Sequence, residues 1–212
     1  MSTPRRLDVT AGDAEPAMGD DALDATLRDA VAALEAEHIP YLLIGGLAST
    51  LLGRPRYTRD VDLFVRQPDA LRALAALGAA RFETEETNPA WIYKAVKREV
   101  TVDLIFWLTG DIYVDDEMLA RAPRLDWAGT PISVVPPEDL VVIKAIVHDE
   151  QNPHHWHDAL GVVAACDLDW EYLAARARHG ARRVLALLVY AQANDLVVTD
   201  ETIRALHASL YG

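Results

Sequence analysis

The chain has 212 residues, of which 51% are hydrophobic, and its formal net charge is −13. This size and apolar content suffice for one hydrophobic core and a small second lobe. An acidic balance of this magnitude argues against sequence-independent binding to nucleic acid, which requires a basic surface. The single cysteine, Cys166, excludes an internal disulfide and a cysteine-based zinc site.

The N-terminal segment and the apolar runs indicate where the protein is located. No apolar run reaches the roughly 18 to 20 residues that a membrane-spanning helix needs. Arg5 and Arg6 are not followed by the apolar stretch of a secretory signal. Residues 1–20 are rich in Pro, Gly, Asp and Thr, so we predict a disordered tail. We therefore expect a cytoplasmic protein without a membrane partner.

Apolar spacing and turn residues predict the elements of the first half. In chain order they are a helix capped by Asp20 or Asp21 and stopped by Pro40, a strand at 41–44, a short helix at 47–52, a strand ending at Val65, a helix at 70–77, a loop at 83–89, and strands at 91–97 and 100–107. We expect Arg98-Glu99 to form the tight turn between the last two strands.

The second half is predicted to be helical. After an apolar strand at 132–135, Pro136-Pro137-Glu138-Asp139 is a strong helix start, with proline in the first turn and acids near the positive end of the dipole. Helical patterns follow at roughly 138–148, 156–166, 171–178, 181–194 and 199–210. We predict an α/β (α+β) fold: a mixed sheet flanked by helices over residues 21–135, followed by a helical lobe over residues 136–212.

A pair of carboxylates is the most informative feature of the chain. Asp60 and Asp62 lie two residues apart in an apolar strand sequence, so both leave the same face of the strand. Adjacent carboxylates repel unless a cation lies between them. Mg²⁺ takes one or two carboxylates together with substrate phosphates. The pair therefore predicts metal-assisted chemistry on a phosphate, and Asp103 adds a third carboxylate on a later strand.

The residues before the pair can bind an anion. Gly45 and Gly46 let the backbone approach a ligand, and the helix after them directs free N–H groups toward it. Ser49 and Thr50 are the hydroxyl candidates on that helix, although one of them can simply face solvent. These features predict a phosphate-binding turn.

Three arginines, Arg54, Arg56 and Arg59, immediately precede the acids. Guanidinium groups suit phosphate oxygens. If the strand begins early enough, its alternation places Arg56 and Thr58 on the side of Asp60. We therefore expect Arg56 to contact the substrate.

This order of motifs resembles the nucleotidyltransferase superfamily that includes DNA polymerase β. Within it, Arg56-x-Thr58-x-Asp60-x-Asp62 and the later Pro137-Glu138-Asp139-Leu140 helix with Lys144 are most similar to small bacterial members, including the nucleotidyltransferase-like toxins of abortive-infection systems. The resemblance extends over residues 41–165. It implies that Asp60, Asp62 and Asp103 are catalytic and hold one or two Mg²⁺ ions, and that Asp103 accepts the proton of the attacking hydroxyl.

The resemblance also implies a set of nucleotide-binding residues. In the similar toxins a lysine on this helix contacts phosphates and a downstream aspartate supports it, positions matched here by Lys144 and Asp158. The usual Gly-Ser of the loop is Gly-Gly in this chain, so Ser49 would have to replace the missing serine contact. The predicted nucleotide-binding residues are Gly45, Gly46, Ser49, Arg56, Thr58, Lys144 and Asp158.

The implied function is Mg²⁺-dependent transfer of a nucleoside monophosphate from an NTP, ATP included, to a hydroxyl acceptor, with release of pyrophosphate. The acceptor is a tRNA, a protein or a small molecule such as an aminoglycoside. The alternative is a catalytically silent nucleotide-binding module that acts as a toxin–antitoxin or regulatory partner. A phosphodiesterase fits the order of motifs less well.

Simpler interpretations remain open for several residues. Lys144 can be a surface lysine whose stem packs on apolar neighbours, and Asp158 a first-turn acid favoured by the helix dipole. We place His154, His155 and His157 in a polar loop, where they lack the i, i+4 spacing of a zinc pair. We therefore expect no zinc site, although such a loop can line the cleft and bring His157 to the substrate.

Overall fold

The structure, a computed structural model, describes residues 21–212. The tail predicted for residues 1–20 and the N-cap at Asp20 lie outside the described residues. A five-stranded sheet has the order β1-β2-β5-β4-β3, formed by β1 (Tyr41–Leu43), β2 (Asp60–Val65), β3 (Glu83–Asn88), β4 (Ile92–Lys97) and β5 (Val100–Ile105). β2 and β5 run parallel, and the other neighbours are antiparallel, which confirms the mixed sheet.

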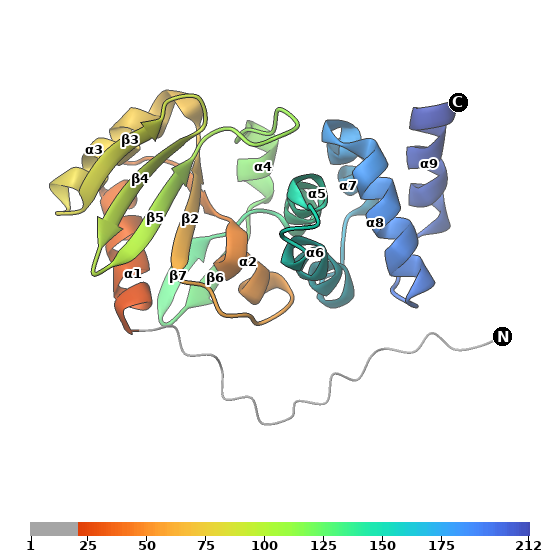
Figure 1. Cartoon of the computed structure of the whole chain (residues 1–212), viewed down its shortest axis with the longest axis horizontal. Helices are drawn as coiled ribbons and strands as arrows, with labels where there is room; N and C mark the ends of the chain where they lie inside the picture. The colour runs from red at the N-terminus through yellow and green to blue at the C-terminus, as the bar shows by residue number, and fades with distance from the viewer. Residues whose placement is uncertain (1–20) are drawn as a thin grey trace.

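Helices cover one face of this sheet and continue beyond it. α1 (Asp21–Ala36) and α3 (Ala70–Ala79) lie on the covered face, and α2 (Gly45–Leu52) joins β1 to β2 (Figure 1). The remaining elements are η1 (Gln67–Asp69), α4 (Asp116–Arg121), the hairpin β6 (Arg124–Trp127) and β7 (Thr130–Ser133), α5 (Pro137–Val147), α6 (His154–Ala165), α7 (Trp170–Arg176), η2 (Ala177–His179), α8 (Ala181–Ala193) and α9 (Asp200–Tyr211). Between residues 21 and 212, none of the helices is long and apolar enough to cross a membrane.

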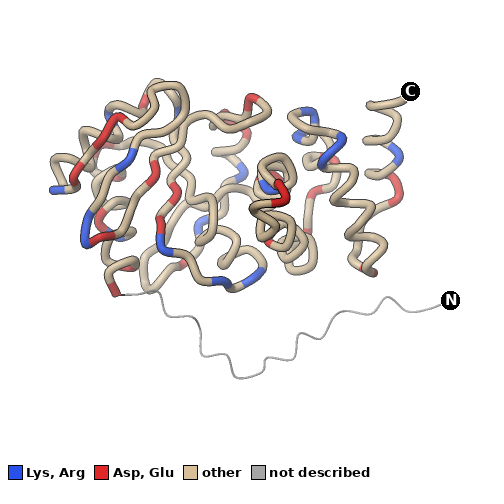
Figure 2. The backbone as a smooth tube through the Cα atoms, viewed as in Figure 1, with Lys and Arg blue, Asp and Glu red and all other residues tan. Residues whose placement is uncertain are grey.

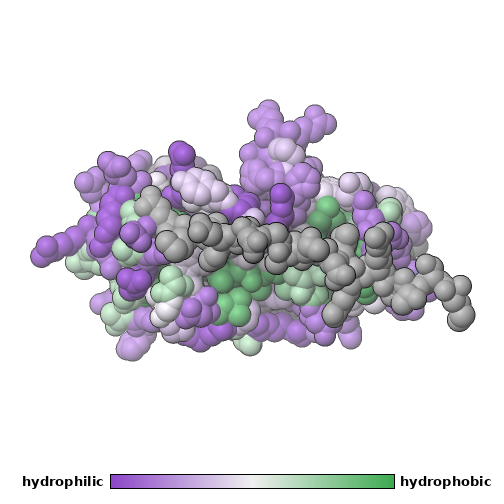
Figure 3. Space-filling model, turned by 90° about the horizontal axis from the view of Figure 1, so that it is seen from below, coloured by the Kyte–Doolittle hydropathy of each residue, from purple (hydrophilic) through white to green (hydrophobic). Residues whose placement is uncertain are grey.

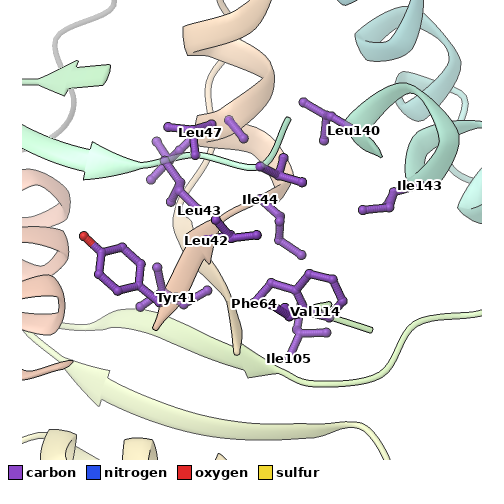
Figure 4. Close-up of a cluster of buried hydrophobic side chains, with 14 of the residues drawn as sticks. Tyr41, Leu42, Leu43, Ile44, Leu47, Phe64, Ile105, Val114, Leu140 and Ile143 are labelled. Atoms are coloured by element: carbon purple, nitrogen blue, oxygen red, sulfur yellow. The ribbon is translucent and has the colours of Figure 1, made fainter. Parts of the chain in front are cut away.

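Most residues of the inner strands β2 and β5 are buried. Val61 and Leu63 are fully buried on the face under α1 and α3. On the opposite face, Phe64 and Ile105 at the ends of β2 and β5 pack near Ile143 of α5 (Figure 4). Asp60 and Asp62 precede Phe64 on this face of β2, and Ile105 borders the same cavity as these two acids. Polar side chains there meet a cavity instead of the core.

The surface is divided by charge and hydropathy. The inner strands carry acids, whereas the loop between α2 and β2 carries basic residues within a few positions of one another (Figure 2). The face seen from below is mostly hydrophilic toward its two ends, with apolar side chains gathered near its middle (Figure 3). The net acidity of the chain therefore coexists with a local basic segment beside the acids.

The structure corrects the predicted elements in three places. Residues 83–89 were expected to form a loop, but Glu83–Asn88 is the edge strand β3, whose exposed polar residues show no apolar alternation. Helix α4 and strand β6 were not expected. Helix α6 begins at His154, so the histidines lie in its first turn and not in a loop; the preceding Asn152-Pro153 is a helix-start signal.

Other expectations agree with the structure. Arg98 and Glu99 have φ values of 54° and 62°, as a two-residue hairpin turn with both central residues left-handed requires. The helices from Pro137 onward confirm the predicted helical C-terminal region. The division of the chain into separate domains near residue 136 stays a prediction.

Candidate active site

The three strand carboxylates lie on one face of the sheet. Asp62 and Asp103 are opposite each other in the parallel pair of β2 and β5, and Asp60 begins β2. Asp60 accepts a hydrogen bond from the hydroxyl of Thr58, with an O–O distance of 2.5 Å. Burial, then the charges of Asp60 and Asp103, raise the pKa of Asp62 to about 7. Carboxylates this close together repel one another, so a bound cation would stabilise them.

The glycine turn touches the acids directly. Gly45 has a φ of +68°, and a Cβ at this position would lie 1.8 Å from Oδ2 of Asp62. A Cβ at Gly46 would lie 2.8 Å from Oγ1 of Thr58 and 2.9 Å from Nη2 of Arg56. Only glycine fits both positions, so the turn brings the N-terminus of α2 against Asp62, Thr58 and Arg56.

The buried Lys144 and Asp158 form a charge cluster beside the turn with the partly exposed Arg56. Nζ of Lys144 lies 2.9 Å and Nε of Arg56 3.2 Å from Oδ2 of Asp158. The side chains of Lys144 and Asp158 are 3% and 0% exposed, which excludes the surface interpretation of Lys144. Burial lowers the pKa of Lys144, and the charge of Asp158 opposes this change. Two cations and one carboxylate give this cluster a net positive charge, which can balance the charge of an anionic ligand.

The hydroxyl groups of α2 have partners within that helix. Ser49 is buried and donates to the carbonyl of Gly45 at 2.8 Å, and Thr50 donates to the carbonyl of Gly46 at 3.1 Å. Each hydroxyl therefore fixes a carbonyl of the glycine turn. A direct contact of Ser49 with phosphate stays a prediction.

A cavity of about 340 Å³ joins most of these residues. Its lining comprises seven predicted residues, Gly45, Gly46, Arg56, Thr58, Asp60, Asp62 and Lys144, together with Ile44, Ile105, Leu108, Ile143, Val147, His154 and His155. Ser49, Asp103 and Asp158 are not part of the lining. A larger cavity of about 600 Å³, between Glu35 and Arg124, contains none of the predicted site residues, so we do not take it as the active site.

The sequence analysis allowed the histidine segment to line the cleft and singled out His157, but the structure places His154 and His155 in the cavity lining. The rings of His154 and His155 lie 4.2 Å apart, and Nδ1 of His155 lies 3.5 Å from Nζ of Lys144. Burial, followed by the charge of Lys144, lowers the pKa of His155 to about 4, so its imidazole is neutral at physiological pH. His157 is exposed and does not line the cavity. The helix-start signal at Pro153 could have placed these histidines in the first turn of a helix.

The acids fit a divalent cation, although they do not form a complete cage. Within residues 21–212, no group of three or more His, Cys, Asp or Glu side chains is arranged to hold a metal ion. Oδ1 of Asp103 instead lies 2.6 Å from Nζ of Lys94. Asp60 and Asp62 provide the one or two carboxylates that Mg²⁺ uses when substrate phosphates supply further oxygens. Burial and the charges of Asp60 and Asp103 raise the pKa of Asp62, so a bound cation would favour its ionised form.

Comparison with known proteins identifies the family. Residues 24–166 match the family described as "Nucleotidyl transferase of unknown function (DUF2204)". The chain belongs to this nucleotidyltransferase family. The predicted superfamily is thereby confirmed, and the protein is an enzyme of the nucleotidyltransferase class, whose general chemistry is transfer of a nucleoside monophosphate. No curated protein matches the chain.

Two solved structures show that the nucleotidyltransferase has a known fold. The antibiotic-resistance factor ANT(2'')-Ia, in its solution structure, is 20% identical with a TM-score of 0.53, over 81% of this chain and 91% of that one. An antigenic nucleotidyltransferase-like protein from Paracoccidioides brasiliensis is 16% identical with a TM-score of 0.52, over 90% of this chain and 94% of that one. At these identities the likeness confirms the predicted fold.

Proposed function

We propose that this nucleotidyltransferase moves a nucleoside monophosphate from an NTP to a hydroxyl acceptor in a Mg²⁺-dependent reaction that releases pyrophosphate. One observation carries the proposal: Asp60 and Asp62 share a cavity with a glycine turn and with the cations Arg56 and Lys144. Cation-binding and anion-binding groups thus lie side by side, which is the combination that a metal-bound triphosphate requires.

Each part of the cavity has a distinct task in this proposal. Gly45 and Gly46 bring the N–H groups of α2 to the phosphates, with Ser49 fixing the turn through the carbonyl of Gly45. Arg56 and Lys144 neutralise phosphate oxygens, and Asp158 holds both cations in place. The apolar wall that includes Ile143 and Val147 restricts water around the bound nucleotide.

The acids and their neighbours would perform the transfer. Asp60 and Asp62 would hold Mg²⁺, with Asp103 as the carboxylate of a second ion, and Thr58 orients Asp60 through its hydroxyl. One or two bound ions would supply charge stabilisation for in-line displacement at the α-phosphate. Asp103 would take the proton of the attacking hydroxyl. The bond to the acceptor oxygen forms as the bond to the pyrophosphate oxygen breaks.

The acceptor is a tRNA, a protein or a small molecule in this proposal, and the enzyme acts in the cytoplasm. Substrates include ATP. The alternative is a silent nucleotide-binding module that works with a cognate antitoxin or a regulatory protein. That alternative predicts nucleotide binding without transfer, so the two differ in one measurable outcome.

The proposal is tested by incubating the purified protein with each α-³²P-labelled NTP, Mg²⁺ and total cell extract. We expect label in RNA, protein or a small molecule, and no label with Asp60→Ala/Asp62→Ala. The matched control is Glu85→Ala/Glu86→Ala, which removes two exposed acids from β3 and should keep the activity. Nucleotide binding without label from any NTP would support the silent module and overturn the proposal.

A further inference from the structure

The third strand carboxylate is already paired with a lysine that the proposed mechanism does not use. Nζ of Lys94, on β4, lies 2.6 Å from Oδ1 of Asp103, on β5. Lys94 faces Asp103 in the antiparallel pair of β4 and β5, and Asp62 faces Asp103 from β2. An ammonium and two carboxylates therefore form a row across three neighbouring strands on one face of the sheet.

This ion pair is much more accessible than the other lysine–carboxylate pair of the site. The side chains of Lys94 and Asp103 are 37% and 16% exposed, whereas Lys144 and Asp158 are almost fully buried. A partly exposed lysine has a long flexible stem and a hydrated ammonium, so it can leave its partner without disturbing the core. The Lys94–Asp103 pair is therefore replaceable, and the Lys144–Asp158 pair is fixed.

We propose that Lys94 is a positioning residue that pairs with Asp103 until a divalent cation takes this carboxylate, so that the cation and the ammonium compete for Asp103. The inference rests on the proposed function, because it requires a cation at these acids. An ammonium and a divalent cation repel each other at short distance. In the structure, where Lys94 is paired with Asp103, the three carboxylates of Asp60, Asp62 and Asp103 are not arranged to hold a metal ion. Lys94 must therefore release Oδ1 of Asp103 before this carboxylate can bind a cation together with the other two.

Because of this competition, binding of a divalent cation to Asp103 depends on whether nucleotide is present. Lys94 weakens the binding of a cation that uses Asp103, but it has little effect on a cation held by Asp60 and Asp62 with substrate phosphates. The triphosphate of a bound nucleotide brings negative charge that favours the divalent cation over the single charge of Lys94. Lys94 thus couples completion of the acidic site to the presence of nucleotide.

The inference is tested by measuring Mn²⁺ binding directly, from the electron paramagnetic resonance signal of the free ion, without acceptor. Titrations are made without nucleotide and with an NTP analogue that carries an α,β-imido bridge. We expect Lys94→Met to bind the weaker Mn²⁺ ion about 3- to 10-fold more tightly than the wild type without nucleotide, with a smaller difference when the analogue is present. Lys94→Arg retains the positive charge and should bind as the wild type does.

Two controls separate competition from a general effect of removing a lysine. Lys97→Met changes a second lysine of β4 that pairs with Asp29, away from the acids, and should leave Mn²⁺ binding unchanged. In an Asp103→Asn background, Lys94→Met should no longer alter the affinity, because the two residues act through one contact. Lys94→Gln provides the same measurement if the methionine variant does not fold.

Equal or weaker Mn²⁺ binding by Lys94→Met would overturn the inference and leave the proposed function intact. Tighter binding that persists in the Asp103→Asn background would also overturn it. If no protein binds Mn²⁺ even with the NTP analogue, the proposed function itself fails together with the inference.

Discussion

The buried charges around Asp139 all meet a partner of opposite charge or a hydroxyl, whereas Asp62 lies between two other carboxylates, Asp60 and Asp103. Oδ1 of Asp139 accepts from Nε of Arg176 at 2.5 Å, and Oδ2 accepts from the hydroxyl of Tyr172 at 2.5 Å. Arg176 also pairs with Asp115, the N-cap of α4, at 2.5 Å. Burial raises the pKa of both carboxylates, but at Asp62 the charges of Asp60 and Asp103 raise it further, against the lowering effects of Lys144 and of a backbone hydrogen bond from Gly46, whereas at Asp139 the charge of Arg176 opposes the effect of burial.

This difference separates a structural network from a ligand-binding one. The network around Asp139 connects α4, α5 and α7 and is satisfied by the protein alone. At the cavity, burial and the charges of Asp60 and Asp103 raise the pKa of Asp62, and Arg56 and Lys144 place two cations against the single carboxylate of Asp158. Charges of both signs that gather beside a cavity indicate a ligand with complementary charges. The same substitution should therefore have opposite consequences in the two places.

The largest effect is expected on activity when the cavity is changed. Asp62→Asn removes a charge from the proposed metal-binding pair while keeping the shape of the side chain, and we expect transfer to fall by about a thousandfold or more. The measurement is the initial rate of label transfer from an α-labelled NTP. Asp126→Asn, an exposed acid of β6, is the control and should keep the wild-type rate. A fall of less than tenfold with Asp62→Asn would contradict the proposed role.

The second effect is expected on stability when the satisfied network is broken. Asp139→Asn leaves the buried Arg176 with Asp115 as its remaining carboxylate, and we expect the free energy of unfolding to fall by about 3 kcal/mol. Urea denaturation followed by circular dichroism measures this change. The exposed pair of Arg204 and Asp200 provides the comparison, because Asp200→Asn should cost less than about 1 kcal/mol. Equal losses would remove the distinction between the network and ordinary surface pairs.

Local patterns predicted the parts of the cavity that are close in sequence. Gly45-Gly46 and Asp60-x-Asp62 were found because turn chemistry and strand alternation act over a few residues. The pairing of Lys144 with Asp158 came only from the resemblance, because this contact depends on the packing of α5 against α6. Which of the histidines line the cavity depends on the same packing, so the sequence pointed to His157 where the structure has His154 and His155. Helical spacing indicates which face is apolar, but it does not say which other helix covers it.

Lys94 differs because the sequence did contain the information that places it. If Arg98-Glu99 is a two-residue turn, each residue of the strand before the turn pairs with the residue at the same distance from the turn in the strand after it. That register places Lys94 opposite Asp103, as the structure confirms. The edge strand β3 gave no such signal, because all of its residues are exposed and its sequence has no apolar period.

A third effect concerns the pH dependence of stability. Burial and the charge of Lys144 lower the pKa of His155 from 6.5 to about 4, so the unfolded chain takes up its proton at a higher pH than the folded protein does. The contribution of His155 to the free energy of unfolding is therefore fully present above about pH 6.5 and is lost as the pH falls toward 4. We expect His155→Gln to reduce the loss between pH 7 and pH 5 by about 1 kcal/mol, as measured by urea denaturation at both pH values. His157→Gln, at the exposed histidine of the same turn, should leave the loss unchanged.

The smallest effect tests the comparison most directly. Without a divalent cation, Asp62→Asn removes repulsion from Asp60 and Asp103, so we expect the free energy of unfolding at pH 8 to rise by about 1 kcal/mol. The change is opposite in sign to that of Asp139→Asn, although both substitutions replace a carboxylate by an amide. The measurement is urea denaturation in EDTA, repeated with saturating Mg²⁺ and an NTP analogue. The ligands should stabilise the wild type more than the variant, because binding to the folded state alone adds to its stability. Destabilisation by Asp62→Asn in EDTA would mean that Asp62 is a satisfied structural residue, and the contrast between the two groups of charges would then be lost.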